Sequence, residues 1–220
     1  MTAPVSRRPP WTARLVAQPL FWAAAVGLLF GLPLLRSMTR RLDAAPAILG
    51  TLPPFALTDQ RGQPFGTREL RGKVWVADFM FTSCESACPL LSQRMAEVGR
   101  RAKGLGPDFH LVSISVDPDR DTPEKLATYA ARYGAHPLAW SFLTGRADEI
   151  EAAVVGGFKV GMGKDPAPGD ADPKSAIFEI FHGENLVLID RELRIRGYFA
   201  ATPEGLDLLM SAVGRVANGA

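Results

Sequence analysis

Residues 73–90, KVWVADFMFTSCESACPL, join an apolar run to the two cysteines of the chain. The run at 73–81 is almost continuously apolar, which is typical of a strand buried on both faces of a sheet. A helical pattern follows from Pro89. Cys84 and Cys88 are therefore predicted to lie between the end of a buried strand and the start of a helix. Open α/β sheets place their ligand sites at this edge.

The rest of the chain alternates between strand and helix patterns. This order predicts an α/β sheet with helices on both faces, in a thioredoxin-like arrangement. The stretch that follows Trp140, SFLTG, is interpreted as core and turn. The other predicted elements are two short strands in FALTDQRGQPF joined by a turn at 59–62, a strand at 110–116, a helix at 122–133, a helix in ADEIEAAVVGGF, a hairpin of NLVLID and LRIRGYF turning at 190–192, and a helix in TPEGLDLLMSAVGRVA.

The C-x-x-x-C pair allows several kinds of site. Positions four apart on a helix share one face with Cα atoms about 6 Å apart, so the thiols could close a disulfide or hold an ion. The positive partial charge of a helix start is expected to lower thiol pKa values and favour the thiolate. A structural disulfide would close too short a loop to stabilise the fold much. The cysteine spacing alone is therefore consistent with either a redox pair or a metal site.

A copper site would need a third ligand, and imidazole commonly completes a soft, sulfur-rich site. His110 begins a predicted strand and His136 lies in a predicted loop, so both are interpreted as structural or exposed. His182, in FEIFHGENLVLID, directly precedes a late strand. In a thioredoxin-like sheet that position lies beside the cysteines, although a structural role remains open. The Gly-, Pro- and Asp-rich residues 161–176 predict a mobile loop leading to His182, whose movement could gate the site.

Asp117 and Asp121 lie in the run SISVDPDRDTPE. Asp121 and Glu124, three residues apart, have the form of a capping box, and Asp117 with Pro118 has the form of a turn. The structural interpretation is therefore a helix start, and the alternative is a docking or tuning role beside the cysteines.

The N-terminal region contains 21 uncharged residues between Arg14 and Arg36. At about 1.5 Å per residue they would span about 30 Å of hydrocarbon. We interpret them as a single transmembrane helix; the alternative is a cleavable signal peptide, because residues 45–47 have the form of a cleavage site. The predicted organisation is a basic segment at 1–14, a transmembrane anchor at 15–35, a linker at 36–50 and a thioredoxin-like domain at 51–220.

Charge is distributed unevenly along the chain. Residues 1–41 hold six arginines and no acidic residue, so the remainder carries 19 basic and 23 acidic residues. The mildly acidic body argues against a nucleic-acid partner. Three arginines lie on either side of the apolar segment, which nearly balances the positive-inside count. We expect an inner, cytoplasmic-type membrane, with the domain on the periplasmic or equivalent non-cytoplasmic side.

Four runs taken together, GKVWVADFMFTSCESACP, SISVDPDRDTPE, WSFLTG and HGENLVLID, resemble the SCO/SenC family of membrane-anchored, copper-binding, thioredoxin-like proteins implicated in cytochrome c oxidase assembly. The resemblance covers about residues 51–210. It implies Cu(I) or Cu(II) as the bound ion and the copper-bearing subunit of the oxidase as a partner, whereas the copper donor stays unidentified. The residues that match the family's copper ligands are Cys84, Cys88 and His182, and those that match its acidic motif are Asp117 and Asp121.

The chain departs from the family pattern at Glu85, where proline is common, and at Gly183, where serine is frequent. Neither change removes a ligand atom, but Glu85 places a negative charge beside the thiols. The expected function is a metallochaperone or thiol-redox assembly factor for the binuclear copper centre. The alternative is a thiol-disulfide oxidoreductase cycling Cys84 and Cys88, although such enzymes use C-x-x-C. A non-catalytic tethered interaction domain is the third interpretation.

Overall fold

The computed structural model describes residues 18–39, 45–85, 87–161 and 185–219. The chain divides into two compact units, Met1–Asp43 and Ala44–Ala220. The two units are described separately below.

The N-terminal unit is helical where the structure describes it. Three consecutive segments are α2 (Pro19–Val26), the π-helical η1 (Gly27–Gly31) and α3 (Leu32–Thr39). Large apolar side chains from Leu20 to Leu35 are exposed along them. No helix in the described part of the chain is both long and apolar enough to cross a membrane.

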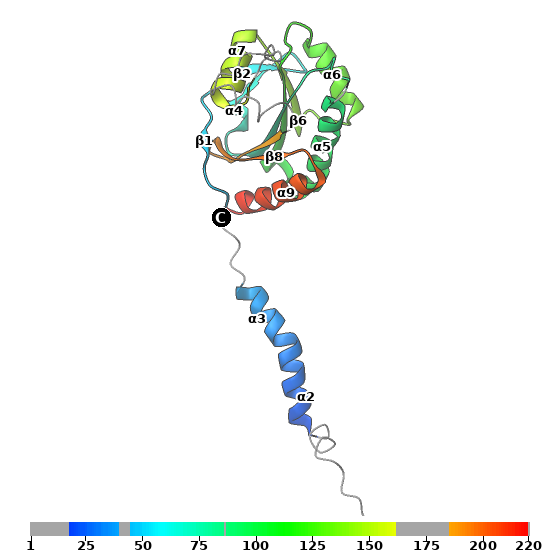
Figure 1. Cartoon of the computed structure of the whole chain (residues 1–220), viewed down its shortest axis with the longest axis vertical. Helices are drawn as coiled ribbons and strands as arrows, with labels where there is room; N and C mark the ends of the chain where they lie inside the picture. Colours follow the sequence, from blue (N-terminus) through cyan, green and yellow to red (C-terminus); the bar gives the residue numbers. More distant parts are fainter. Residues whose placement is uncertain (1–17, 40–44, 86, 162–184, 220) are drawn as a thin grey trace, which may run out of the picture. The chain divides into compact units, whose positions relative to one another are not determined.

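The described part of the C-terminal unit is built on an eight-stranded sheet with the order β1-β8-β7-β4-β5-β6-β2-β3 (Figure 1). The central strands β4, β5 and β6 are parallel, and the other neighbouring pairs are antiparallel. The strands are β1 (Gly50–Thr51), β2 (Ala56–Asp59), β3 (Pro64–Gly66), β4 (Val74–Met80), β5 (Phe109–Ser115), β6 (Trp140–Thr144), β7 (Asn185–Ile189) and β8 (Arg194–Ala200).

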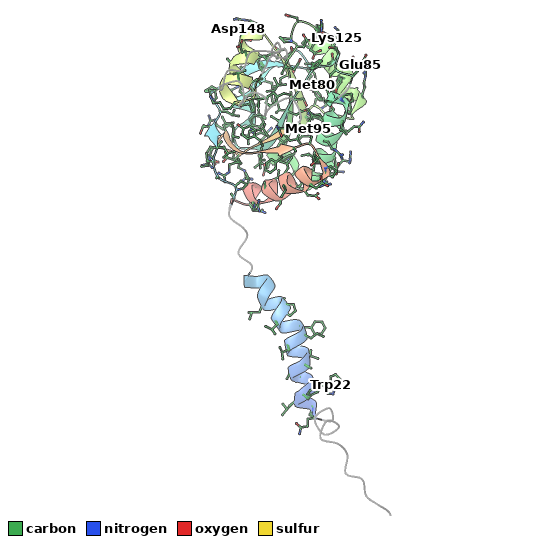
Figure 2. All side chains as sticks on the ribbon, in the orientation of Figure 1. Trp22, Met80, Glu85, Met95, Lys125 and Asp148 are labelled. Carbon is green, nitrogen blue, oxygen red and sulfur yellow. The ribbon has the colours of Figure 1, made fainter. Side chains whose placement is uncertain are left out.

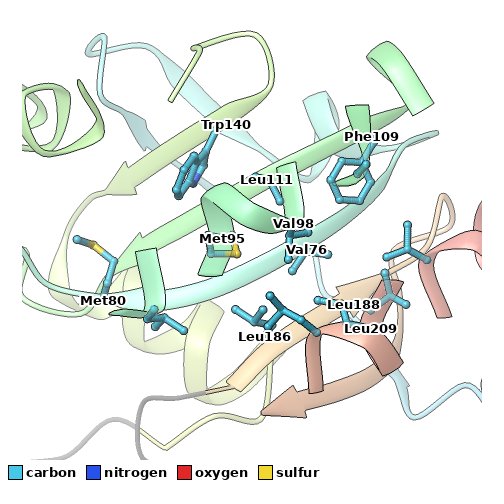
Figure 3. Close-up of a cluster of buried hydrophobic side chains, with 14 of the residues drawn as sticks. Val76, Met80, Met95, Val98, Phe109, Leu111, Trp140, Leu186, Leu188 and Leu209 are labelled. Carbon is cyan, nitrogen blue, oxygen red and sulfur yellow. The ribbon is translucent and has the colours of Figure 1, made fainter. Parts of the chain in front are cut away.

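Helices cover both faces of this sheet, as the sequence predicted. One face packs against α5, α6 and α9, and we refer to the side chains buried there as the α5 core (Figure 3). The other face packs against α4, α7 and η3, and this is the α7 core. The helical segments are α4 (Thr67–Leu70), α5 (Ala87–Arg101), the 3-10 segment η2 (Lys103–Asp108), α6 (Pro123–Arg132), α7 (Ala147–Glu151), the π-helical η3 (Ala152–Gly157) and α9 (Pro203–Ala217).

Strand β4 shows why the apolar run at 73–81 decides the fold. Every residue of the strand is buried. Val76 and Met80 enter the α5 core, whereas Trp75 and Phe79 enter the α7 core. Because successive side chains of a strand point to opposite faces, one continuous apolar run supplies both cores.

Most predicted elements are confirmed, and the structure adds the strand β6, which the sequence analysis did not predict. Trp140 and the stretch SFLTG after it were interpreted as core and turn; residues 140–144 are buried, as predicted for core, and they also form the strand β6, which is parallel to β5. Trp140 itself is core, as expected, with 3% of its surface exposed. The stretch is only five residues long, and it interrupts its apolar residues with Ser141. The side-chain hydroxyl of Ser141 pairs with His110 in the buried sheet, so a polar residue is tolerated there.

Candidate functional site

The two cysteines lie at the carboxyl end of β4. Residues 81–85, here called the cysteine loop, leave the sheet after Met80, and α5 begins at Ala87. Cys84 therefore precedes the helix, and Cys88 occupies its first turn. This corrects the prediction that both thiols share one helix face, because α5 starts too late to include Cys84.

Neither thiol forms a disulfide in the structure. The backbone N–H of Cys84 donates to the Phe81 carbonyl at 3.2 Å, which folds the loop into a turn. The backbone N–H of Cys88 donates to the Cys84 sulfur at 3.3 Å. The sulfur of Cys84 thus accepts a hydrogen bond from one of the backbone N–H groups that a helix start leaves without intrahelical partners.

Burial separates the two thiols chemically. Cys84 is partly buried, whereas Cys88 is only 6% exposed and packs in the α5 core. Burial, and to a lesser extent the hydrogen bond with Cys84, raise the pKa of the Cys88 thiol to about 12. The expectation of a lowered thiol pKa is therefore wrong for Cys88, because the loss of hydration outweighs the helix start. Cys88 keeps its proton near neutral pH until a ligand displaces it.

A buried acid that sequence reasoning missed lies beneath the pair. Asp78 of β4 is 0% exposed and contributes to the electrostatic environment of Cys88. Its Oδ1 accepts a hydrogen bond from the Ser113 hydroxyl at 2.5 Å, and Ser113 accepts one from the Trp140 indole N–H at 2.9 Å. Its Oδ2 has no hydrogen-bond partner among the described residues. Burial raises the pKa of Asp78 to about 7. The available signal was an acid inside an otherwise apolar strand.

Asp121 lies beside the cysteine loop rather than in a capping box. Its carboxylate accepts hydrogen bonds from the Thr82 N–H at 2.9 Å and the Thr82 hydroxyl at 2.5 Å. The Ser115 hydroxyl donates a third at 2.6 Å. The cap of α6 is Thr122, whose hydroxyl accepts from the Lys125 N–H. The capping-box prediction is therefore wrong, because the Asp121 side chain turns inward to the loop.

Asp117 lies at the edge of the same network. Its N–H donates to the Ser115 hydroxyl at 3.1 Å, and its carbonyl accepts from the backbone N–H groups of Arg120 and Asp121. The predicted turn is thus confirmed. The carboxylate of Asp117 is partly exposed and lies 3.4 Å from Arg120. The acidic residue Glu85 lies exposed at the same end of the domain as Lys125 (Figure 2).

Two of the three histidines are placed, and neither belongs to the site. His110 is buried in β5, 3.0 Å from the Ser141 hydroxyl and stacked on Phe65. Burial lowers its pKa to about 4, so it is neutral near pH 7. His136 is exposed, and its Nδ1 accepts from the Leu138 N–H. Both agree with the predicted structural or exposed roles.

The third histidine, His182, lies outside the described residues, as does the predicted loop 161–176 apart from Gly161. The described chain resumes at Asn185, where β7 begins. Val187 of β7 pairs with Ala77 of β4 in an antiparallel register, so β7 begins at the sheet edge where β4 ends. Within the described residues, no three His, Cys, Asp or Glu side chains gather closely enough to hold a metal ion.

Comparison with known proteins identifies the family. A family model described as SCO1/SenC matches residues 47–216. The chain belongs to the SCO1/SenC family. The SCO1 protein homolog of Bacillus subtilis (strain 168) is 38% identical over 107 residues, which are 48% of this chain and 55% of that protein. The chain thus aligns with only about half the length of this SCO1 relative.

Solved SCO structures confirm the thioredoxin-like α/β fold. BsSco, described as a member of the Sco family of cytochrome c oxidase assembly proteins with a disulfide switch, matches with a TM-score of 0.66 and 27% identity. The match covers 82% of this chain and 100% of that one. Bradyrhizobium japonicum ScoI with copper bound matches with a TM-score of 0.59 and 26% identity, over 76% of this chain and 99% of that one.

Proposed function

We propose that this protein binds copper through Cys84, Cys88 and His182 and acts in maturation of the binuclear copper centre of cytochrome c oxidase. The observation that carries the proposal is the pair of reduced thiols, not joined in a disulfide, at the end of β4 and at the edge where β7 begins. The family supports it, because ScoI has been solved with copper and BsSco belongs to an oxidase-assembly family.

The donors suit a soft ion. Two thiolate sulfurs and one imidazole nitrogen are ligands that copper accepts, and three such donors suit Cu(I) or complete most of a tetragonal Cu(II) site. His182 is three residues before Asn185 in the chain, and three extended residues reach about 10 Å. The imidazole is therefore within chain reach of the sheet edge that carries the thiols.

The thiol protons link copper uptake to pH. A thiol must lose its proton to become a metal ligand, so binding releases protons. Because burial raises the pKa of Cys88 to about 12, this thiol is protonated before binding at neutral pH. Copper affinity is accordingly expected to increase as pH rises from 6 to 8.

The second candidate is a thiol-disulfide oxidoreductase, and the unequal burial of the thiols favours it. Cys84 is accessible enough to meet a substrate disulfide, and Cys88 lies behind it as a resolving thiol. The high pKa of Cys88 opposes rapid exchange, since the thiolate is the attacking form. We therefore place this activity second to copper binding.

Copper stoichiometry tests the proposal directly. The reduced full chain in detergent is expected to bind one copper ion, and the same protein with a Cys84–Cys88 disulfide is expected to bind none, because oxidation removes both sulfur ligands. Measurement of bound metal after removal of excess copper checks both results. Equal binding by the oxidised and reduced forms would contradict a thiolate site.

We further propose that residues 15–35 anchor the protein in an inner, cytoplasmic-type membrane, with the domain on the non-cytoplasmic side. Support comes from the lack of charged residues in this segment and from the exposed apolar side chains of α2, η1 and α3, among them Trp22 (Figure 2). A lipid phase would cover these side chains, which nothing described in the N-terminal unit buries.

Protease protection tests the anchor. In cells whose outer layers are permeabilised but whose cytoplasmic membrane is intact, added protease is expected to digest the domain. In a separate experiment, a chain lacking residues 1–35 is expected to lose membrane association. A domain that becomes protease-sensitive only after the cytoplasmic membrane is opened would contradict the proposed orientation.

A further inference from the structure

The cysteine loop is fastened to a distant part of the chain by one buried carboxylate. The last sheet contact before the loop is the bond from the Val116 N–H to the Met80 carbonyl at 2.9 Å. Two residues later, Asp121 accepts hydrogen bonds from both the N–H and the hydroxyl of Thr82. The loop therefore remains tied to the β5–α6 connection after it has left the sheet.

The carboxylate is well suited to this contact. Asp121 is 0% exposed, and its two oxygens together accept three hydrogen bonds, two from Thr82 and one from the Ser115 hydroxyl. Hydrogen bonds to an ionised acceptor are shorter and stronger than neutral ones. Asp121 is also followed directly by Thr122, the cap of α6, so its backbone is held by the helix start.

Thr82 lies inside the turn that places Cys84. The Cys84 N–H bonds to the Phe81 carbonyl, so Thr82 is enclosed between the two bonded residues. The Cys84 sulfur in turn lies 3.3 Å from the backbone nitrogen of Cys88. A displacement of Thr82 would therefore move the Cys84 sulfur relative to Cys88.

We propose that Asp121 is a positioning residue for the thiol pair, which acts through Thr82 to hold Cys84 at the distance from Cys88 that the metal requires. The effect of Asp121 on copper binding rests on the proposed function. Its effect on the position of the cysteine loop does not, because that contact is present in the metal-free protein. Residues that hold metal ligands in place from outside the coordination sphere commonly change metal affinity about 10–100-fold when removed.

The main test variant is Asp121→Asn, which keeps the shape of the side chain. Its amide nitrogen can only donate, so it cannot accept from the donors that meet one of the carboxylate oxygens. Asp119→Asn is the matched control, because it removes the same charge from an exposed side chain in the same turn. Thr82→Val removes the hydroxyl side of the contact and keeps the backbone N–H.

Two readouts separate positioning from stability. In the metal-free full chain, Asp121→Asn is expected to speed amide exchange of Thr82 and Cys84 at least about tenfold relative to Asp119→Asn, since the loop opens more often. The copper affinity of Asp121→Asn is expected to be about 10–100-fold weaker than that of Asp119→Asn. The double variant Asp121→Asn/Thr82→Val should lose less affinity than the two single losses combined, because both changes break one contact.

The outcomes are distinct. The proposal is overturned if Asp121→Asn exchanges and binds copper like Asp119→Asn, or if it lowers only the melting temperature. Full additivity in the double variant also overturns it. If Asp121→Asn does not fold, the test rests on Thr82→Val. The proposal is then rejected if Thr82→Val shows the same amide exchange and the same copper affinity as the wild type. If the wild-type chain binds no copper, the proposed function is wrong. The amide-exchange data then test only whether Asp121 holds the cysteine loop in place.

Discussion

The His182→Ala variant is expected to bind copper at least about a hundredfold more weakly than the wild type, since losing a direct ligand should exceed the 10–100-fold effect of an outer residue. The thiols at Cys84 and Cys88 supply two donors, and the imidazole supplies the third. Without it, the ion keeps only sulfur ligands and solvent. A competition titration with a copper chelator, performed on the reduced full chain, measures the change.

The chain offers a matched control for this variant. His136 is exposed and is far in sequence from the cysteine loop, so His136→Ala should bind copper like the wild type. Cys84→Ser and Cys88→Ser should each lose at least as much affinity as His182→Ala. These four variants compare the three proposed ligands with a histidine of no expected role.

The same variants distinguish the two candidate functions. An oxidoreductase needs both sulfurs but tolerates loss of the imidazole, because thiol exchange proceeds through sulfur alone. If His182→Ala binds copper as tightly as the wild type, and either serine variant abolishes a robust disulfide-reductase activity, the copper function is wrong and the redox enzyme replaces it.

The contribution of Asp78 to the stability of the wild-type fold is expected to decrease as pH rises. Burial raises the pKa of Asp78 from 3.8 to about 7 in the folded state. Between these values the unfolded chain has lost the proton that the folded chain keeps, so folding becomes less favourable as pH increases. Above pH 7 both states are ionised and the full penalty applies. The difference between the two pKa values corresponds to a loss of on the order of 4 kcal/mol of folding free energy.

Replacing Asp78 by asparagine should remove this pH dependence. From pH 5 to pH 8 the wild type is expected to lose about 2–3 kcal/mol more of its unfolding free energy than Asp78→Asn does. The pH slope is the measured quantity, because the buried amide has its own cost at every pH. Urea denaturation at both pH values gives the result, and Asp119→Asn serves as the control. Parallel slopes in wild type and Asp78→Asn would contradict a buried, protonated Asp78.

Strong periodic patterns made the fold predictable. The apolar run that became β4, the hairpin of β7 and β8, and the helix α9 each have a length and period that few alternatives share. The strand β6 was missed because a five-residue segment with an internal serine has no period to recognise. Its identity depends on pairing with β5, which is a contact between distant parts of the chain.

The site was less predictable than the fold. Spacing identified Cys84 and Cys88, but their unequal burial depends on where α5 begins and how it packs. The raised pKa of Cys88 and the hidden carboxylate of Asp78 are both consequences of burial, which local sequence does not report. Asp121 and Glu124 have the spacing of a capping box. The Asp121 carboxylate instead accepts hydrogen bonds from Thr82, which is 39 residues away in the chain and therefore outside any local pattern.

The short strand β1 also determines how the domain responds to a mechanical pull from its N-terminal side. Gly50 and Thr51 pair with the first residues of β8, and the neighbouring bonds from Leu49 and Leu52 to β8 and its turn are 2.9 Å each. These contacts lie at the opposite end of the sheet from the cysteine loop, because β8 begins beside the end of β7. A load would peel residues 45–51 away first and release about 20 Å of chain. The sheet around the thiols would stay closed while this length of chain is released.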